Sequence, residues 1–162
     1  MDRWARVGAS SPSVLLHATC VSIAGRGALL MGPSGAGKSD LALRLIHAAV
    51  STEGQALSAV LVADDQVLIE LRDGHLVARA PAILAGLIEV RGLGILQVPS
   101  VAETGLALAV ELVPSAMIER LPDPMPSLAI LGQQLPLIRL AAFEASAPLK
   151  VVLALRRALP RS

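Results

Sequence analysis

Aromatic side chains are almost missing from this 162-residue chain, which has one Trp, one Phe and no Tyr. Proteins that bind single-stranded nucleic acid usually stack the bases on aromatic rings, so this scarcity argues against such a partner. The net charge is +1 and no block of like charges occurs. Without a basic patch there is no electrostatic footprint for nucleic acid or for an anionic membrane. The composition therefore predicts neither kind of partner.

A continuous apolar run long enough to span a bilayer is also missing, although hydrophobic residues make up 54% of the chain. A spanning helix needs about 18 or more such residues, and the longest candidates are short or interrupted by Glu89 or Glu111. His17 and Arg26 break the N-terminal apolar stretch, which therefore does not resemble a signal peptide. The single cysteine, Cys20, excludes an internal disulfide and predicts a small buried side chain. We expect a soluble, cytoplasmic protein.

Short apolar runs of β-type composition alternate with turn signals along most of the chain. The expected strands cover residues 14–16, 19–23, 28–31, 59–63, 67–71, 76–80, 106–113 and 128–131. The pair Asp73-Gly74 between two of these runs predicts a hairpin. One helix is clear, from Lys38 to about Val50, because its apolar residues recur at helical spacing. The tail 147–159 is either a helix or a strand followed by a helix.

The order of these elements predicts the fold class. Strands outnumber helices and include a hairpin, which differs from the strict alternation of a doubly wound parallel sheet. We expect an α/β fold with a mixed, strongly bent sheet and the helix packed on it. The length suits one domain with one core. Residues 1–12 are expected to form a flexible N-terminus, and residues 13–158 a single domain.

The segment from Gly32 to Ser39 has the G-x-x-x-x-G-K-S spacing of a phosphate-binding P-loop, or Walker A motif. Its residues are Gly32, Pro33, Ser34, Gly35, Ala36, Gly37, Lys38 and Ser39. Backbone N–H groups of such a loop surround a phosphate, and the positive end of the following helix adds to the field. Lys38 would neutralise the β- and γ-phosphates, and Ser39 would bind Mg²⁺. The motif predicts binding of ATP, or of a similar polyphosphate, with magnesium.

Charged residues near two other apolar runs are candidates for the same site. Asp64 and Asp65 follow the run 59–63, as in a Walker B strand that delivers a carboxylate to the metal. Adjacent strand residues point to opposite faces, so only one Asp would face the metal unless the strand has already ended. Glu89 and Arg91 share one strand face. That face either meets the site, where Glu89 would bind metal and Arg91 phosphate, or points to water.

The remaining polar candidates have weaker local signals. His17, His47 and His75 are not at metal-ligand spacing, and a structural role is the simplest interpretation of His17. Arg120 precedes a loop rich in proline, and by itself it would be a plain surface residue. Their residue types alone therefore assign a catalytic role to neither His17 nor Arg120.

Three motifs in order resemble the catalytic domain of the HPr kinase/phosphorylase family, bacterial bifunctional enzymes that act on a serine of the phosphocarrier protein HPr. They are the P-loop continued by Lys-Ser-Asp at 38–40, Leu-Val-Ala-Asp-Asp at 61–65, and Ala-Pro at 80–81 leading into Ile-Glu-Val-Arg-Gly-Leu-Gly-Ile at 88–95. The likeness runs from about residue 14 to residue 152. It implies a P-loop core related to phosphoenolpyruvate carboxykinase, and a hexamer.

The resemblance also implies roles for individual residues. Asp65 resembles the residue that takes the serine proton during phosphorylation and returns it in the reverse reaction. Ser39 and Glu89 resemble magnesium ligands. His17 and Lys38 match the family's other active-site His and Lys. Such roles are physically coherent, because a serine hydroxyl needs a base and phosphoryl transfer depends on positioning and charge neutralisation.

Other parts of the chain match the family less closely. Arg120 lies where the family has a catalytic Arg, on a short local match. The family's longer members carry an N-terminal domain that is absent here, as in the short forms typical of alphaproteobacteria. Residues 99–105 replace a Phe-Gly-rich continuation, and residues 141–148 replace a Gly-Arg-Asn-type segment that serves dephosphorylation. The resemblance therefore favours the forward kinase over phosphorolysis of phosphoserine.

Three functional hypotheses follow. The first is a serine kinase that phosphorylates HPr with Mg²⁺ and ATP, with pyrophosphate as an alternative donor. The second is a small-molecule kinase or carboxykinase, in which Arg91 with Arg120 or Arg139 would bind a substrate carboxylate. The third is a nucleotide-sensing module without efficient transfer. The presence of Asp65 and Lys38 favours an enzyme over a sensing module.

Overall fold

The computed structural model describes residues 10–47, 50–52 and 54–158. Its strands are β1 (Ser13–His17), β2 (Thr19–Ile23), β3 (Arg26–Met31), β4 (Val50–Thr52), β5 (Gln55–Leu57), β6 (Ala59–Ala63), β7 (Gln66–Arg72), β8 (His75–Arg79), β9 (Leu87–Val90), β10 (Gly94–Gln97), β11 (Glu103–Leu112), β12 (Ser127–Ile130) and β13 (Gln133–Leu140). Its helices are α1 (Lys38–His47) and α2 (Ala147–Arg157), with short 3₁₀ turns η1 (Ala82–Leu84) and η2 (Ser115–Met117). Most of the N-terminus predicted to be flexible, residues 1–12, lies outside the described residues. Residues 48–49 of the first predicted helix and residue 159 of the predicted tail helix also lie outside them.

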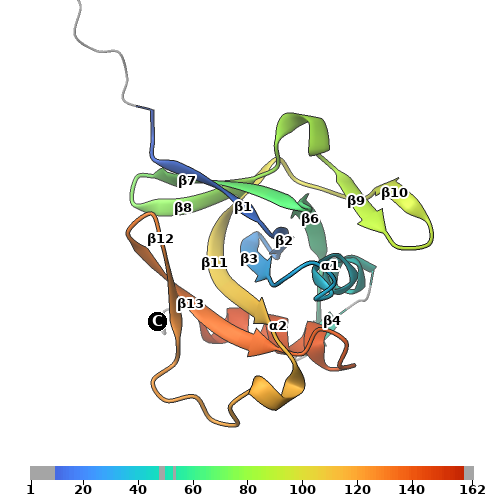
Figure 1. Ribbon diagram of the computed structural model, residues 1–162, viewed down its shortest axis with the longest axis vertical. Coiled ribbons are helices and arrows are strands. Elements are labelled where there is room, and N and C mark those ends of the chain that lie inside the picture. The colour runs from blue at the N-terminus through green and yellow to red at the C-terminus, as the bar shows by residue number, and fades with distance from the viewer. Residues whose placement is uncertain (1–9, 48–49, 53, 159–162) are drawn as a thin grey trace, which may run out of the picture.

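One large sheet organises the chain in the strand order β1-β7-β8-β11-β3-β2-β6, and β13 with β12 branches from β11. The ten-residue strand β11 has two neighbours along one edge, because residues 103–105 pair with β8 and residues 109–112 pair with β13. Its other edge pairs with β3 in parallel. Parallel and antiparallel pairs are mixed and the sheet curls round the molecule (Figure 1). The predicted mixed, bent sheet is therefore confirmed.

The core forms two clusters that the alternation of the central strands keeps apart. Leu108 and Val110 of β11 belong to the first cluster, which α1 and α2 cover. Ala109, between them, belongs to the second cluster, which the curled sheet encloses with residues of β7, β8, β12 and β13. Only one face of the sheet therefore has to be covered by helices. In the described part of the chain, the two short helices α1 and α2 cover that face.

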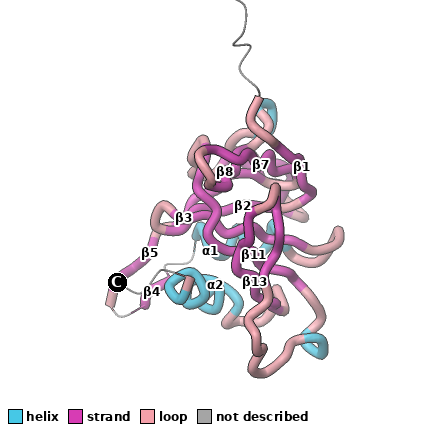
Figure 2. Tube along the Cα trace, turned by 90° about the vertical axis from the view of Figure 1, so that its left-hand side faces the viewer, coloured by secondary structure: helices cyan, strands magenta, loops and turns pink. Residues whose placement is uncertain are grey.

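Both helices cover the first cluster with one apolar face. Leu41 and Leu45 of α1 and Val151 and Leu155 of α2 are buried at a spacing of four residues, as expected for helices packed on a sheet. Both helices contribute to the first cluster, and Figure 2 shows α2 beside the strands, next to β4. Pro148 stands in the first turn of α2, where no backbone hydrogen bond is lost. The tail is therefore one helix without a preceding strand.

The expected strands and the Asp73-Gly74 hairpin are confirmed, while β10, β13 and the short pair β4–β5 are not among the predicted strands. Pro136 weakens the strand signal of β13 because proline cannot donate to a ladder. It precedes residues 137–140, which pair with β11, so that ladder is uninterrupted. Within the described ranges, no helix is both long and apolar enough to cross a membrane.

Candidate active site

A cavity of about 340 Å³, called the loop pocket below, opens where the glycine-rich loop after β3 enters α1. It is lined by His17, Thr19, Ser34, Gly35, Gly37, Lys38, Ser39, Asp40, Leu43, Asp65, Glu89, Val90, Arg91 and Phe143. These residues come from the β1–β2 connection, the loop with α1, the β6–β7 turn, the β9–β10 hairpin and the segment before α2. Segments far apart in the sequence thus meet at one end of the sheet.

The loop itself holds a lysine against its backbone. Gly37 has φ +97°, and a Cβ added there would lie 2.8 Å from the Ala142 Cβ, so the position requires glycine on both counts. The buried Lys38 ammonium donates hydrogen bonds to the carbonyl oxygens of Gly32 at 2.7 Å and Pro33 at 3.0 Å. An ammonium has three donors, so one N–H of Lys38 is left for a ligand in the pocket.

Asp64 is buried beneath the pocket and joins three elements through its carboxylate. Oδ1 accepts hydrogen bonds from Ser39 Oγ at 2.7 Å and Thr19 Oγ1 at 2.9 Å, and Oδ2 accepts one from the Glu89 backbone N–H at 3.2 Å. These bonds offset the cost of burying the charge. They also place a serine hydroxyl and a carboxylate together at the start of α1, in reach of one small cation.

Asp65 follows directly and lines the pocket. Strand β6 ends at Ala63, so the two aspartates lie in the bend after it; Asp65 lines the pocket, whereas the buried Asp64 reaches the site through Ser39. The Asp65 side chain is 68% exposed, and its Oδ1 lies 2.9 Å from His17 Nε2. Its φ of +68° is in the left-handed region, which aspartate adopts more readily than most residues with a side chain.

The β9–β10 hairpin presents Glu89 and Arg91 to the same pocket. The sequence left open whether Glu89 and Arg91 point to the site or to water, and in the structure both line the loop pocket. The hydrogen bond from the Glu89 N–H to Asp64 joins the hairpin to the β6–β7 turn. Gly92 and Gly94 have φ of +89° and +98°, which lets the chain reverse between the strands. The side chains of Glu89 and Arg91 thus face the loop across the opening.

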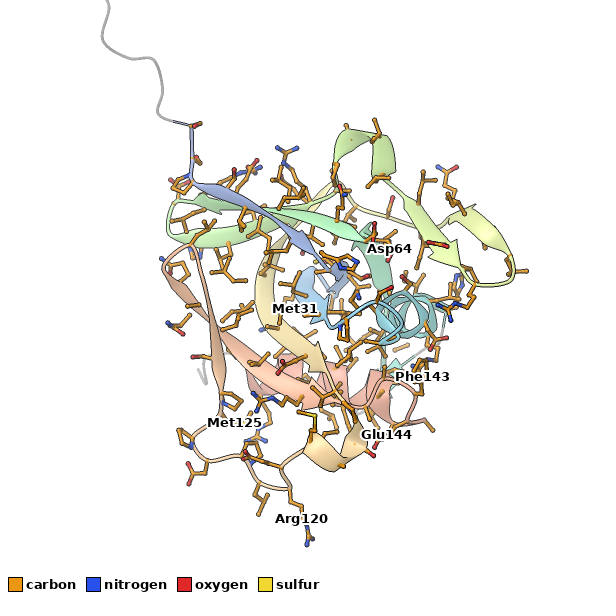
Figure 3. All side chains as sticks on the ribbon, viewed as in Figure 1. Met31, Asp64, Arg120, Met125, Phe143 and Glu144 are labelled. Atoms are coloured by element: carbon orange, nitrogen blue, oxygen red, sulfur yellow. The ribbon has the colours of Figure 1, made fainter. Side chains whose placement is uncertain are left out.

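Arg120 does not join these residues, and the placement implied by its short family match is not found in the described fold. It lies in the exposed segment between η2 and β12, at the opposite end of the molecule from Asp64 (Figure 3). There it lines a second cavity of about 520 Å³, called the distal cavity below. Arg139 lines the distal cavity too, so neither arginine can pair with Arg91 in the loop pocket.

Thr19 and Phe143 line the pocket and are not among the sequence-based candidates. Thr19 is buried at the start of β2, and a threonine in an apolar strand gives no functional signal until its partner Asp64 is known. Phe143 is 71% exposed and its ring lies against Gly37, where an added Cβ would be 2.9 Å from Cζ. Its only sequence signal is that it is the sole phenylalanine of the chain.

The charged groups offer a small cation few protein ligands. The described part of the chain contains no group of three or more His, Cys, Asp or Glu side chains suited to a metal. Mg²⁺ usually takes one or two carboxylates and completes its shell with water and substrate phosphates. Asp64, with the Ser39 hydroxyl beside it and Glu89 at the rim, therefore fits Mg²⁺ bound together with a phosphate ligand.

Three described residues outside the pocket have shifted pKa values. Burial raises the pKa of the Cys20 thiol, which agrees with the small buried side chain expected there. Hydrogen bonds from Arg79 and Arg72 lower the pKa of Glu70, on the β7–β8 hairpin. Hydrogen bonds to Glu70 and Glu103 raise the pKa of Arg72. Packing and ion pairing within the sheet account for all three.

Comparisons with known proteins agree with one another. The family model of the HPr serine kinase C-terminal domain matches residues 9–152. An HPr kinase/phosphorylase of Cupriavidus metallidurans is 37% identical over 141 residues, which cover 81% of this chain and 41% of that protein. One of Clostridium tetani is 43% identical over 90 residues, covering 56% and 27%. The chain thus spans less than half the length of these curated relatives.

A solved structure agrees as well. The Hpr(Ser) kinase/phosphatase from Coxiella burnetii superposes with a TM-score of 0.74 at 26% sequence identity, and the match covers 89% of each chain. The curled sheet with its two helices is therefore an architecture already known in a solved protein.

Proposed function

The chain belongs to the HPr serine kinase C-terminal domain family, and we propose that residues 13–158 form the catalytic domain of an ATP-dependent protein-serine kinase that phosphorylates HPr. The single observation that supports this most is the meeting of the Gly32–Ser39 loop with Asp65 in one pocket. A loop for the donor's phosphates and an exposed carboxylate for the acceptor's proton are the two parts that phosphoryl transfer to a hydroxyl requires.

The donor's phosphates would lie over the loop. Backbone N–H groups at the start of α1 and the free N–H of Lys38 would bind the phosphate oxygens. Asp64, Ser39 and Glu89 would hold Mg²⁺, which when bound neutralises charge on those oxygens. The hydrogen bond of 2.7 Å between Ser39 and Asp64 keeps both side chains in position for this task. The donor in this proposal is ATP.

Asp65 would act as the general base. An incoming serine hydroxyl can reach it because the carboxylate is exposed in the pocket. His17, 2.9 Å from Oδ1, would orient the carboxylate so that Oδ2 receives the serine proton. Arg91 at the rim would bind the transferring phosphoryl group.

The relatives are named kinase/phosphorylase or kinase/phosphatase, so the proposal includes removal of the phosphoryl group from phosphoserine. This dephosphorylation reaction is tested by a separate assay. Phospho-HPr incubated with inorganic phosphate and Mg²⁺ should yield pyrophosphate and HPr. A homohexameric assembly and a cytoplasmic location complete the proposal; sedimentation equilibrium of the purified chain tests the hexamer.

The decisive experiment is transfer of labelled γ-phosphate from ATP to HPr. The wild-type chain with Mg²⁺ should label HPr on serine, and Asp65→Asn, which keeps the shape but removes the base, should label it about 10²- to 10⁴-fold more slowly. Asp73→Asn, a matched change of an exposed carboxylate in the β7–β8 turn outside the pocket, should retain most of the transfer. Absence of transfer by the wild type, or equal rates for wild type and Asp65→Asn, would refute the proposal.

Two other hypotheses are less well supported. A small-molecule kinase or carboxykinase was expected to bind a carboxylate between Arg91 and Arg120 or Arg139, and the latter two lie at the distal cavity. A sensing module without transfer does not require an exposed carboxylate beside the phosphate loop. Tight ATP binding without transfer to HPr would nevertheless favour the sensing module.

A further inference from the structure

We propose that Phe143 is the platform on which the base of the nucleoside triphosphate stacks, so that this residue makes the pocket select a nucleotide over a bare polyphosphate. The inference rests on the proposed function and adds a specificity-determining residue to it. Most residues that line the loop pocket are glycines or have polar or charged side chains. The three apolar side chains of the lining are Leu43, Val90 and Phe143.

The position of Phe143 suits the base and not the reacting phosphate. Asp64 and Phe143 lie on opposite sides of α1 (Figure 3). The carboxylates that would serve the metal and the acceptor gather at the Asp64 end. A triphosphate with its γ-phosphate there and its chain along the loop directs its nucleoside away from that end. The ring of Phe143 lies against Gly37, directly beside the path of the phosphates.

The chemistry of the ring matches a nucleobase. The tip of the Phe143 ring, at Cζ and Cε1, lies against Gly37, while the residue as a whole is 71% exposed. An aromatic ring that is held at its tip and exposed elsewhere leaves surface on which a base can stack, and every nucleobase has a π face. Leu43 of α1, which also lines the pocket, adds apolar surface near this end. Neither group can bind a phosphate.

The segment that carries Phe143 is held in place before any ligand arrives. Arg44 of α1 donates from Nη2 to the carbonyl oxygen of Ala142 and from Nη1 to that of Glu144 at 3.3 Å, so it grips the backbone on both sides of Phe143. The Arg44 Nε also pairs with Asp40 at 2.9 Å. Lys150 of α2 binds the Glu144 carboxylate at 2.7 Å. A ring on a fixed segment loses little freedom when it is stacked, which favours binding.

The test compares two ligands that differ in the nucleoside. Equilibrium binding of MgATP and of magnesium tripolyphosphate is measured by calorimetry for the wild type, Phe143→Ala and Phe143→Tyr. The exposed position of Phe143 makes these variants compatible with folding, which circular dichroism checks. Loss of one stacking contact should weaken MgATP binding of Phe143→Ala roughly tenfold. Tripolyphosphate binding should change less than twofold, and Phe143→Tyr should restore ATP binding because it keeps the ring.

The outcomes separate this inference from the proposed function. If Phe143→Ala weakens both ligands equally, or neither, the ring does not recognise the base and the inference is overturned while the phosphate site stands. The same holds if the wild type binds tripolyphosphate as tightly as ATP. If the wild type binds neither ligand, the phosphate site fails and both proposals fall together.

Discussion

The loop pocket and the distal cavity differ in how charge is arranged in them. The distal cavity is the larger, about 520 Å³ against about 340 Å³, yet its lining is mostly apolar and Glu119 is its only acid. The loop pocket is smaller and gathers Lys38, Asp65, Glu89 and Arg91 from separate elements. Convergence of opposite charges, and not cavity size, therefore favours the loop pocket as the place of the proposed reaction.

The difference follows from what surrounds each cavity. The loop pocket lies where β2, β3, β6 and β9 end or begin, so turns from several strands deliver polar groups to one place. The distal cavity lies between α2, β13 and the proline-rich segment before β12. Two of its cations already have partners, since Arg139 pairs with Glu111 and Lys150 with Glu144. Its other charged lining residues are Glu119, Arg120 and Arg157, and no glycine-rich loop lines it.

Among the substitutions described next, the largest effect is expected from removing the Lys38 ammonium of the loop pocket. Lys38→Met keeps the aliphatic stem and removes the ammonium that would face the phosphates. Loss of one such group from a preorganised site reduces turnover by about 10²- to 10³-fold. The measurement is the initial rate of HPr phosphorylation at saturating ATP, with a thermal melt to show that the fold persists. A rate within threefold of wild type would contradict the assignment of the pocket.

A change beneath the pocket should affect stability and metal dependence together. Asp64→Ala removes the shared acceptor of Thr19 and Ser39, and buried donors left without partners cost about 1–3 kcal/mol. We expect a lower midpoint of urea unfolding and a higher Mg²⁺ concentration for half-maximal transfer. Thr19→Val is the matched control, because it removes one donor of Asp64 and keeps the carboxylate. It should shift the Mg²⁺ requirement much less than Asp64→Ala; equal shifts would argue against a metal ligand.

The smallest effect is expected at the distal cavity. Arg120→Ala should change the rate of HPr phosphorylation by the purified chain less than twofold, because Arg120 is exposed at the far end of the molecule. Arg91→Ala, the same substitution at the rim of the loop pocket, provides the contrast and should slow transfer at least tenfold, by loss of one charge-assisted contact. If Arg120→Ala slows transfer as much as Arg91→Ala, the contrast between the two cavities fails.

The sequence predicted the parts of the site that depend on local order. The loop from Gly32 to Ser39 needs only a strand before it and a helix after it, and Asp64 needs only a strand that ends, so neighbouring residues define both. The positions of Arg120 and Phe143 could not be predicted from local sequence. Each lies in a segment without regular structure, and the path of such a segment depends on contacts made elsewhere in the fold. For Phe143 these are the bonds of Arg44 on α1, about a hundred residues earlier in the chain.

In the fold, too, features set by local sequence were predicted and features set by distant contacts were not. Apolar runs of β-type residues identify most strands. The outer strands β1, β7 and β8 show alternating exposure, whereas β2 and β3 are buried along most of their length because they face both core clusters. The strand β13 escapes prediction because Pro136 lowers its propensity, and its pairing with the distant β11 compensates only in the folded chain. The bent sheet was foreseen from the excess of strands. The branching at β11 was not, since no local signal indicates that one strand edge serves two neighbours.

That shared strand also determines how the protein should open. β11 pairs with β8, β3 and β13 and sends Leu108 and Ala109 into different core clusters, so it cannot detach without disrupting both. In native-state hydrogen exchange, the amides of residues 108–110 should therefore exchange only through global unfolding. The β9–β10 hairpin, paired with nothing but itself in the sheet pattern, should exchange by local opening. The rim of the pocket would then be free to adjust to an incoming protein while β3, which leads into the loop, stays closed.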